Sequence, residues 1–279
     1  MSWLEAIVLG IVQGLTEFLP ISSSAHLSIV GQLFFEGKDP GAAFTAITQL
    51  GTETAVILYF ARDIGRIIKA WWLSIVGIFT GKTSRPLDPD ARMGWLVILG
   101  SIPIIILGLL FEDAIDTYLR NLWITVGMLA GFAVLIWLCD RFAQNYTELE
   151  KLTWADGIAF GFAQAMALIP GVSRSGATIA AGLFMGYKRE AATRYSFLLA
   201  IPAVFGSGLY KLFKAFTSDS PVSWGPTLVA TLIAFAVGLG VIHWVLKYIS
   251  THSFNIFVCY RLAIAALTAA LIIFGVLQA

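Results

Sequence analysis

The sequence predicts an all-α polytopic membrane protein, an inverted repeat with two re-entrant helical hairpins and about six full transmembrane helices. Three observations predict it: few charged residues, six apolar segments of membrane-spanning length, and two apolar regions interrupted at matching positions. Of the 279 residues, 58% are hydrophobic and 13% are charged, with a mean hydropathy of +0.83. Soluble domains carry about 25% charged residues. Most of this chain's surface is therefore expected to face lipid.

Six segments approach the length needed to cross a hydrocarbon core about 30 Å thick. Four contain almost only apolar residues: Trp95–Phe111, Leu122–Cys139, Gly225–Leu246 and Phe257–Val276. Two others, Ala42–Phe60 and Ala192–Lys211, include polar residues. Tryptophans mark many of the ends, as in an interfacial belt. We expect one transmembrane domain over residues 1–279.

Two further apolar regions do not fit simple spans. Leu4–Phe35 is interrupted by Pro20–Ser24, and Asp156–Tyr187 is interrupted by Pro170–Ser175. Each region predicts a half-helix, a turn within the membrane and a returning half-helix. Irregular backbone at that depth is tolerated where protein buries it or where it lines a wet cavity.

The two interrupted regions are related by a constant offset of 151 residues. Identical residues match at four pairs of positions: Gly10 and Gly161, Gln13 and Gln164, Ser22 and Ser173, Ser24 and Ser175. The repeat predicts two halves, about 1–150 and 151–279. Interrupted helices at matching places in two halves indicate a binding site where the halves meet.

The distribution of basic residues predicts that the halves are inverted. The loop after Phe60 carries six of them and is expected in the cytoplasm: Arg62, Arg66, Lys69, Lys82, Arg85 and Arg92. The two serine turns then enter the membrane from opposite faces. Lys211 and Lys214 fall on the outer face, against this assignment.

The sequence argues against a nucleic-acid partner, a disulfide and a cleavable signal peptide. The net charge of +1 does not suggest nucleic acid as a partner. Cys139 and Cys259 lie in apolar runs without metal-ligand spacing, which predicts buried thiols rather than a disulfide. The start of the chain lacks the basic region typical of a cleavable signal peptide.

The first turn carries candidate catalytic and binding residues. Gln13 and Glu17 are four apart and share one face of the half-helix. Ser22, Ser23 and Ser24 are suited to cap the returning half-helix, with His26 one turn further. An ionisable residue at this depth indicates function by default. The structural alternative is a pair of Glu17 with His26 or Arg174 that ties the halves together.

The second turn has the parts of a phosphate site. A helix N-terminus favours anions, and Arg174 offers a planar fork that binds phosphate oxygens in pairs. Ser173, Ser175 and Thr178 add hydroxyl groups, and Gly171 permits a tight turn. Helix capping is the structural alternative for this cluster.

Together, the two turns offer the groups that phosphoryl transfer needs, mainly positioning and charge stabilisation. An inverted-repeat secondary transporter or lipid flippase is the alternative, because interrupted helices are common there. A structural scaffold gives no reason to bury Glu17 and Arg174. The attacking group stays open between Ser23, His26 and a metal-activated water.

The two motifs, Gln13–His26 and Pro170–Thr178, together with Tyr260 and Arg261, resemble the undecaprenyl-pyrophosphate phosphatases, also called bacitracin-resistance proteins. The resemblance implies hydrolysis of a polyprenyl pyrophosphate in the bacterial plasma membrane, which recycles the lipid carrier of peptidoglycan synthesis. It also implies a divalent cation, Mg²⁺ or Ca²⁺. Membrane lipid and a second copy of the chain are candidate partners.

The resemblance also implies roles for individual residues. Glu17 would bind the metal or act as acid and base, while Ser23 and His26 would lie near the scissile phosphate. Phosphate binding falls to the second motif: Ser173, Arg174, Ser175 and Thr178. Substrate binding extends to Gln13, Ser22 and Ser24.

Two positions depart from the family pattern: Gln13, where many relatives have Glu, and Ala25, where many have Gly. Glu53 is a further acidic residue in an apolar run. It could serve the site or pair elsewhere in the bundle.

Overall fold

The protein is a bundle of helices, described here from a computed structural model covering residues 1–35, 40–81, 87–119, 121–217 and 222–278. Within these ranges the regular elements are helices, without a strand. Five helices are long and apolar enough to cross a membrane: α5 (Pro89–Leu110), α7 (Leu122–Phe142), α10 (Arg189–Thr217), α11 (Trp224–Ile249) and α12 (Asn255–Ile273). The prediction of an all-α polytopic membrane protein is confirmed.

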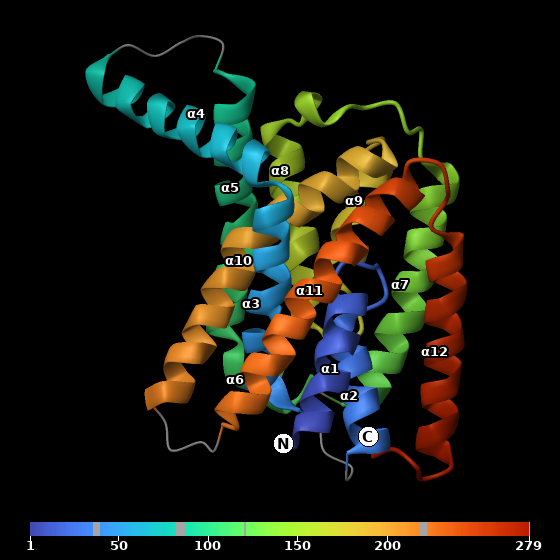
Figure 1. Cartoon of the computed structure of the whole chain (residues 1–279). Coiled ribbons are helices and arrows are strands. Elements are labelled where there is room, and N and C mark those ends of the chain that lie inside the picture. Colours follow the sequence, from blue (N-terminus) through green and yellow to red (C-terminus); the bar gives the residue numbers. More distant parts are fainter. Residues whose placement is uncertain (36–39, 82–86, 120, 218–221, 279) are drawn as a thin grey trace.

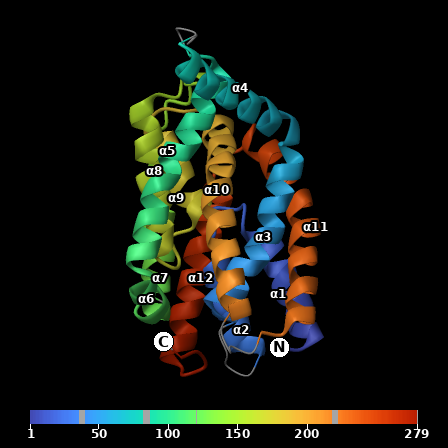
Figure 2. The same ribbon diagram turned by 90° about the vertical axis from the view of Figure 1, so that its left-hand side faces the viewer.

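Helix α3 (Gly41–Tyr59) occupies the place of the sixth expected span. It is 19 residues long and packs against α10 and α11 (Figures 1 and 2). It is less apolar than the other five because polar residues such as Thr48, Thr52 and Glu53 occur along it, and all three are fully buried. The polar residues of this segment therefore face the interior of the bundle.

The segment after Phe60 is a helix rather than a loop, which corrects the sequence prediction. Helix α4 (Ala61–Thr80) lies across one end of the bundle (Figure 1). Its first half carries Arg62, Arg66 and Lys69, whereas Trp72 and Phe79 are large exposed apolar residues. Such amphipathic helices lie in the plane of a membrane interface. Lys82 and Arg85 fall outside the described residues.

The two interrupted regions form helical hairpins that enter the bundle from opposite ends (Figure 1). The first pairs α1 (Trp3–Thr16) with α2 (Ser23–Phe34), and the second pairs α8 (Trp154–Ala165) with α9 (Arg174–Phe184). Their turns share an uncommon backbone: φ is 73° at Ser22 and 70° at Ser173. The matched positions therefore adopt matched conformations, while the boundary near residue 150 stays a prediction.

Glycines hold the first arm of each hairpin against a helix of the other half. A Cβ atom at Gly10 of α1 would lie 2.6 Å from the carbonyl oxygen of Ala230 in α11. A Cβ atom at Gly161 of α8 would lie 2.7 Å from the carbonyl oxygen of Gly100 in α5. Only a residue without a side chain permits such close backbone approach. The repeated glycine pair thus has one structural role in both halves.

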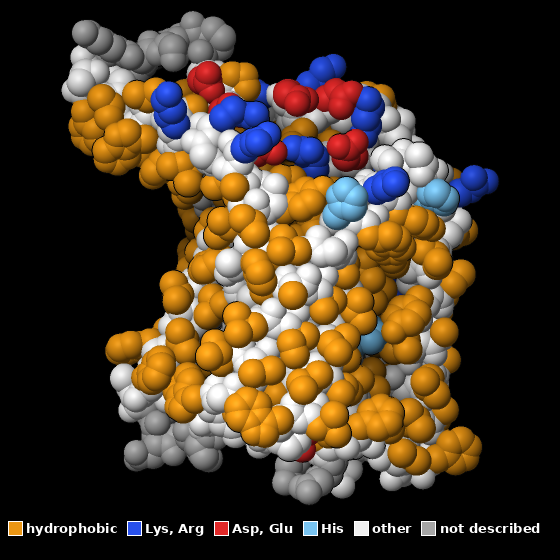
Figure 3. Space-filling model, in the orientation of Figure 1, with side chains coloured by type: hydrophobic (Ala, Val, Ile, Leu, Met, Phe, Trp, Pro, Cys, Tyr) orange, Lys and Arg blue, Asp and Glu red, His pale blue; other side chains and the backbone are white. Residues whose placement is uncertain are grey.

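Charged side chains gather at the end of the bundle covered by α4, and the visible face below it is mostly apolar (Figure 3). At the other end, Lys211 and Lys214 of α10 form ion pairs of 2.7 and 3.2 Å with Glu112. Glu112 begins the short helix α6 (Glu112–Thr117). The ion pairs with Glu112 explain how two lysines can lie at the end of the bundle that is predicted to face outward.

The two cysteines form no disulfide. Cys139 is a buried thiol, as predicted, but Cys259 is exposed. Cys259 lies on α12, where neighbouring Tyr260 and Leu262 are also exposed. An exposed position on a membrane-spanning helix is expected to face lipid, and a weakly polar thiol is compatible with lipid.

Candidate functional site

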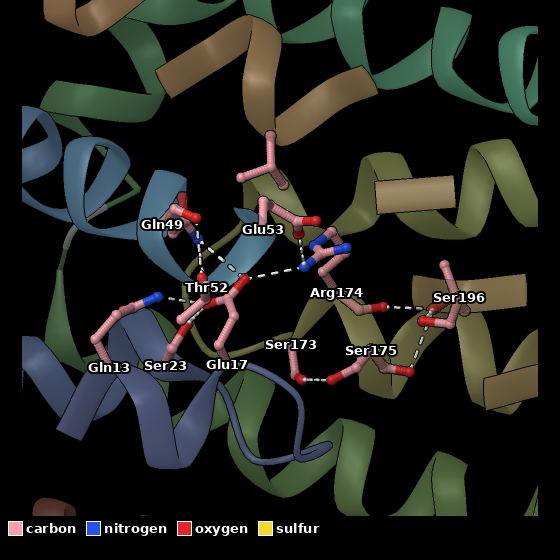
Figure 4. A network of polar contacts seen from close by, with 12 residues as sticks. Gln13, Glu17, Ser23, Gln49, Thr52, Glu53, Ser173, Arg174, Ser175 and Ser196 are labelled. Atoms are coloured by element: carbon pink, nitrogen blue, oxygen red, sulfur yellow. Dashed lines mark hydrogen bonds and ion pairs between the residues drawn. The ribbon is translucent and has the colours of Figure 1, made fainter. Parts of the chain in front are cut away.

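The carboxylate of Glu17 collects hydrogen bonds at the first turn (Figure 4). Its Oε2 accepts from Gln13 Nε2 at 2.8 Å and from Ser23 Oγ at 2.6 Å. Gln49 Nε2, from α3, lies 3.3 Å from both carboxylate oxygens. The i, i+4 spacing on α1 brings Gln13 beside Glu17, and the turn brings Ser23 back to it. Glu17 is therefore anchored by groups from three helices.

Arg174 bridges two buried carboxylates. Its Nη2 donates to Glu17 Oε1 and to Glu53 Oε1, each at 3.0 Å (Figure 4). The three side chains are 10%, 3% and 0% exposed, for Arg174, Glu17 and Glu53. A buried charge is tolerated when it is paired and hydrogen-bonded. Because Arg174 begins α9, these ion pairs join the second hairpin to the first hairpin and to α3.

A cavity of about 530 Å³ lies against this cluster. One part is lined by the polar residues of the two turns: Glu17, Ser22, Ser23, Ser24, Gln49, Ser173 and Arg174. Apolar side chains of α5 and α10 also line it, such as Ile104, Ile105, Leu109 and Val204. Glu112, Tyr210 and Lys211 line a further part. The site therefore combines a small polar pole with a long apolar wall.

The two returning half-helices begin at this polar pole, but they are capped differently. Ser173 Oγ accepts from the backbone N–H of Gly176 at 3.2 Å, which is an N-cap for α9. Ser22 makes no such bond, although each of these serines contacts the hydroxyl two residues further on at 3.2 Å, Ser24 and Ser175 respectively. The prediction that the serines cap the first returning half-helix is thus wrong for the Ser22 side chain. The uncapped N-terminus of α2 retains N–H groups suited to an anion.

Arg261 of α12 holds the two turns together behind the site. Its guanidinium donates to the carbonyl oxygens of Pro20 at 3.0 Å and Gly171 at 2.8 Å, one from each turn. It also donates to the carbonyls of Leu129 and Met128 in α7, both at 3.1 Å. Arg261 is fully buried. The bonds to Pro20 and Gly171 satisfy turn carbonyls that have no helical partner at depth.

The oxygen atoms at the site fit a hard divalent cation held together with a phosphate ligand. Gln13 Oε1 and Glu53 Oε2 are buried without a hydrogen-bond partner, and Glu17 faces the cavity. Mg²⁺ and Ca²⁺ prefer such oxygen donors. Among the described residues, no cluster of three or more His, Cys, Asp or Glu side chains could hold an ion alone. The ligand itself would have to supply part of the coordination shell.

Comparison with known proteins places the chain. The sequence profile of the family described as bacitracin resistance protein BacA matches residues 6–267. The chain belongs to this family. A protein of Pseudarthrobacter chlorophenolicus named undecaprenyl-diphosphatase is 60% identical over 282 residues, covering 100% of both chains. Undecaprenyl-diphosphatase of Micrococcus luteus is 59% identical with the same coverage. Undecaprenyl-diphosphatase 2 of Agrobacterium fabrum is 58% identical, covering 100% of this chain and 99% of the relative.

Six of the ten site residues predicted from the two motifs line the polar pole. Glu17, Ser23 and Arg174 lie at the cavity and are linked by hydrogen bonds through Glu17. Ser22, Ser24 and Ser173 also line the cavity. Gln13 reaches Glu17 from behind and is fully buried. The structural alternative of a Glu17–Arg174 pair is present in the geometry, and it coincides with the candidate site.

Three other predicted site residues, His26, Ser175 and Thr178, are not among the described residues that line the cavity. His26 Nδ1 contacts the Ser22 carbonyl oxygen at 2.7 Å, and His26 Nε2 contacts the Tyr260 hydroxyl at 2.9 Å. Ser175 Oγ donates to the Leu19 carbonyl oxygen at 3.0 Å, which links the turns. Thr178 Oγ1 donates to the Arg174 carbonyl oxygen at 2.8 Å. These contacts support the backbone around the site.

The sequence predicted no role for Gln49 or Arg261 and left the role of Glu53 undecided. Gln49 and Glu53 are four apart on α3, so their spacing signalled a shared polar face. Arg261 is an ionisable residue within a membrane-spanning helix, which is itself a functional or structural signal. Neither signal named the partner, because the contacts join residues more than thirty positions apart.

Arg261→Met should destabilise the fold. The substitution keeps a long side chain but removes all donors to the four carbonyl groups. An unsatisfied buried acceptor costs about 1–3 kcal/mol, so we expect a lower thermal unfolding midpoint in detergent. Arg66→Met is the matched control, because the Arg66 side chain is 63% exposed. An unchanged midpoint for Arg261→Met would contradict the role of Arg261 in holding the turns.

Proposed function

We propose that the chain is a phosphoric anhydride hydrolase that cleaves undecaprenyl pyrophosphate to undecaprenyl phosphate and inorganic phosphate. The grouping of Ser23, Glu17 and Arg174 at one pole of a partly apolar cavity carries the proposal. The name shared by relatives 58–60% identical supports it. None of these relatives is named as a transporter, so the enzyme is favoured over the transporter alternative.

The apolar wall suits the lipid part of this substrate. Ile105 and Leu109 line the cavity and are 41% and 60% exposed, so the cavity is open along α5. A prenyl chain could leave the cavity there and enter the bilayer while its pyrophosphate stays at the polar pole. We assign the protein to the bacterial plasma membrane, where it would recycle the lipid carrier of cell-wall synthesis and confer resistance to bacitracin.

Ser23 is the best-placed nucleophile. Its hydroxyl donates to Glu17 at 2.6 Å, the arrangement of a nucleophile beside its base. Ser23 Oγ would bond to the terminal phosphorus, its proton would pass to Glu17, and the bridging P–O bond would break to release undecaprenyl phosphate. Water would then hydrolyse the phosphoserine and release inorganic phosphate. His26 faces Tyr260 and would position the turn instead.

Arg174 would stabilise the charge on the transferring phosphoryl group. To do so it must exchange its bond to Glu17 for bonds to phosphate oxygens, while Glu53 still holds the guanidinium. Glu17 and the oxygen atoms around it fit a divalent cation. Such a cation, when bound, would neutralise negative charge on the phosphate groups. Glu17 is the only carboxylate at the polar pole of the cavity among the described residues.

The proposed reaction is tested with purified protein in detergent and undecaprenyl pyrophosphate. We expect release of inorganic phosphate without a sealed membrane, whereas a transporter would yield none. Arg174→Lys keeps the charge but loses the fork, so the rate should fall about a hundredfold or more with the protein still folded. Near-normal activity in Arg174→Lys would leave Arg174 as a structural link between the hairpins.

Attack by Ser23 predicts a covalent intermediate. Rapid acid quench during turnover should trap acid-stable phosphoserine at Ser23, and Ser23→Ala should form none. Ser24→Ala is the matched control, because Ser24 lines the same cavity but does not contact Glu17. Absence of any phosphoenzyme would favour direct attack by water, and acid-labile phosphohistidine would favour His26.

The roles of Glu17 and Glu53 can be distinguished by measuring the hydrolysis rate as a function of metal concentration. Glu17→Gln should abolish metal-dependent activity because, among the described residues, Glu17 is the carboxylate that faces the cavity at the polar pole, whereas Glu53 lies behind Arg174 and does not line it. Gln13→Glu should be tolerated and should lower the metal concentration for half-maximal rate, since a carboxylate is a better ligand than an amide. Glu53→Gln should keep the wild-type metal dependence. The assignment fails if Glu17→Gln keeps its metal dependence while Glu53→Gln loses it.

A further inference from the structure

Gln49 of α3 lies at the polar pole, although it belongs to neither of the two turns. One face of α3 lines the cavity, at Ala42, Thr45, Ala46 and Gln49, which follow one another at helical spacing. The amide nitrogen of Gln49 lies 3.3 Å from both carboxylate oxygens of Glu17 (Figure 4). Gln49 is therefore beside the proposed base and shares the cavity with it.

The contact with Glu17 fixes which way the Gln49 amide points. An ionised carboxylate only accepts hydrogen bonds, so the NH2 group must face Glu17 and the carbonyl oxygen, Oε1, must face away from it. Within the described part of the chain, Gln49 Oε1 has no hydrogen-bond partner. Unlike Gln13 Oε1, it is not buried. Because Gln49 lines the cavity, this oxygen is accessible to a water molecule there.

The distances around Glu17 show that Gln49 is not its main anchor. Three shorter bonds already hold the carboxylate, from Ser23 at 2.6 Å, Gln13 at 2.8 Å and Arg174 at 3.0 Å. The Gln49 contacts of 3.3 Å lie beyond the usual range of an N–H···O bond. Anchoring of Glu17 therefore does not explain an accessible amide oxygen beside it.

We propose that Gln49 positions the water that hydrolyses the phosphoserine at Ser23, and so acts in the second step of the reaction. This assignment rests on the proposed function. The water would donate one hydrogen to Gln49 Oε1 and the other to Glu17, and these two side chains are in contact with each other. An amide that orients the attacking water is an established device in phosphoryl transfer.

The second step balances with the groups at the polar pole. The water oxygen bonds to phosphorus while the bond from phosphorus to Ser23 Oγ breaks. Glu17 takes a proton from the water and returns one to Ser23 Oγ, which lies 2.6 Å from it in the free protein. Inorganic phosphate leaves, and the serine hydroxyl is restored. The proton that Glu17 took from Ser23 in the first step leaves with undecaprenyl phosphate, so Glu17 is again a base when the water attacks.

Gln49→Met tests the assignment, because it keeps the length of the side chain and removes the amide. Rapid acid quench of the purified protein with undecaprenyl pyrophosphate measures how fast phosphoserine forms and decays. We expect decay to slow roughly ten- to hundredfold and formation to change little. Phosphoserine should then accumulate. Both kcat and KM should fall while kcat/KM stays unchanged, because the first step is intact.

Gln13→Met is the matched control. Gln13 also donates an amide hydrogen to Glu17, at 2.8 Å, but it is fully buried and is not among the described residues that line the cavity. Loss of this anchor should slow both steps, since Glu17 is the base in each. We expect kcat and kcat/KM to fall together in Gln13→Met, without accumulation of phosphoserine.

A second variant covers the case in which Gln49→Met fails to fold. Gln49→Asn keeps the amide but withdraws it by one methylene group, so phosphoserine should accumulate there as well. The proposal is overturned if the folded Gln49 variants behave like Gln13→Met or like the wild-type protein. It is also overturned if the wild-type protein releases phosphate without forming phosphoserine. Failure of the proposed function differs from these outcomes, because the wild-type protein would then release no phosphate from the lipid.

Discussion

The geometry of the candidate site depends on how the turns of the two helical hairpins are held inside a membrane. Backbone carbonyls at the turns lack helical partners, and lipid offers none. Arg261 supplies donors to Pro20 and Gly171 at once, and its remaining donors fix it to α7. One side chain from the last helix therefore joins the two turns. The Ser175–Leu19 hydrogen bond and the Glu17–Arg174 ion pair join them as well.

Charge balance imposes a second constraint on the interior. Glu17 and Glu53 carry two negative charges, and Arg174 and Arg261 carry two positive charges, if all four are ionised. A buried charge without compensation costs several kcal/mol, which explains why the carboxylates converge on one guanidinium. The Gln13 amide adds a donor to this cluster without adding charge. In this chain the second carboxylate comes from α3 and not from the first turn.

Much of the fold followed from residue patterns that act locally. Apolar length set the spanning helices, and the Pro20 and Pro170 breaks with their serines located both turns. One feature escaped because the pattern alone was ambiguous: helix α4 was treated as a loop, since its basic residues also suit one. The contacts of His26 could not be predicted either, because its ring meets Tyr260, more than two hundred residues away in the chain.

The sequence by itself determined the membrane environment, the interrupted hairpins and the polar residues that the turns carry. Composition, helix length and helix-breaking residues decide these features through local solvation and backbone sterics. Only the tertiary structure decided which polar groups meet: Glu53 with Arg174, Arg261 with both turns, and Glu112 with Lys211. Such pairings depend on how distant helices cross, because the free energy of burying a charge is set by the partner that packing brings to it.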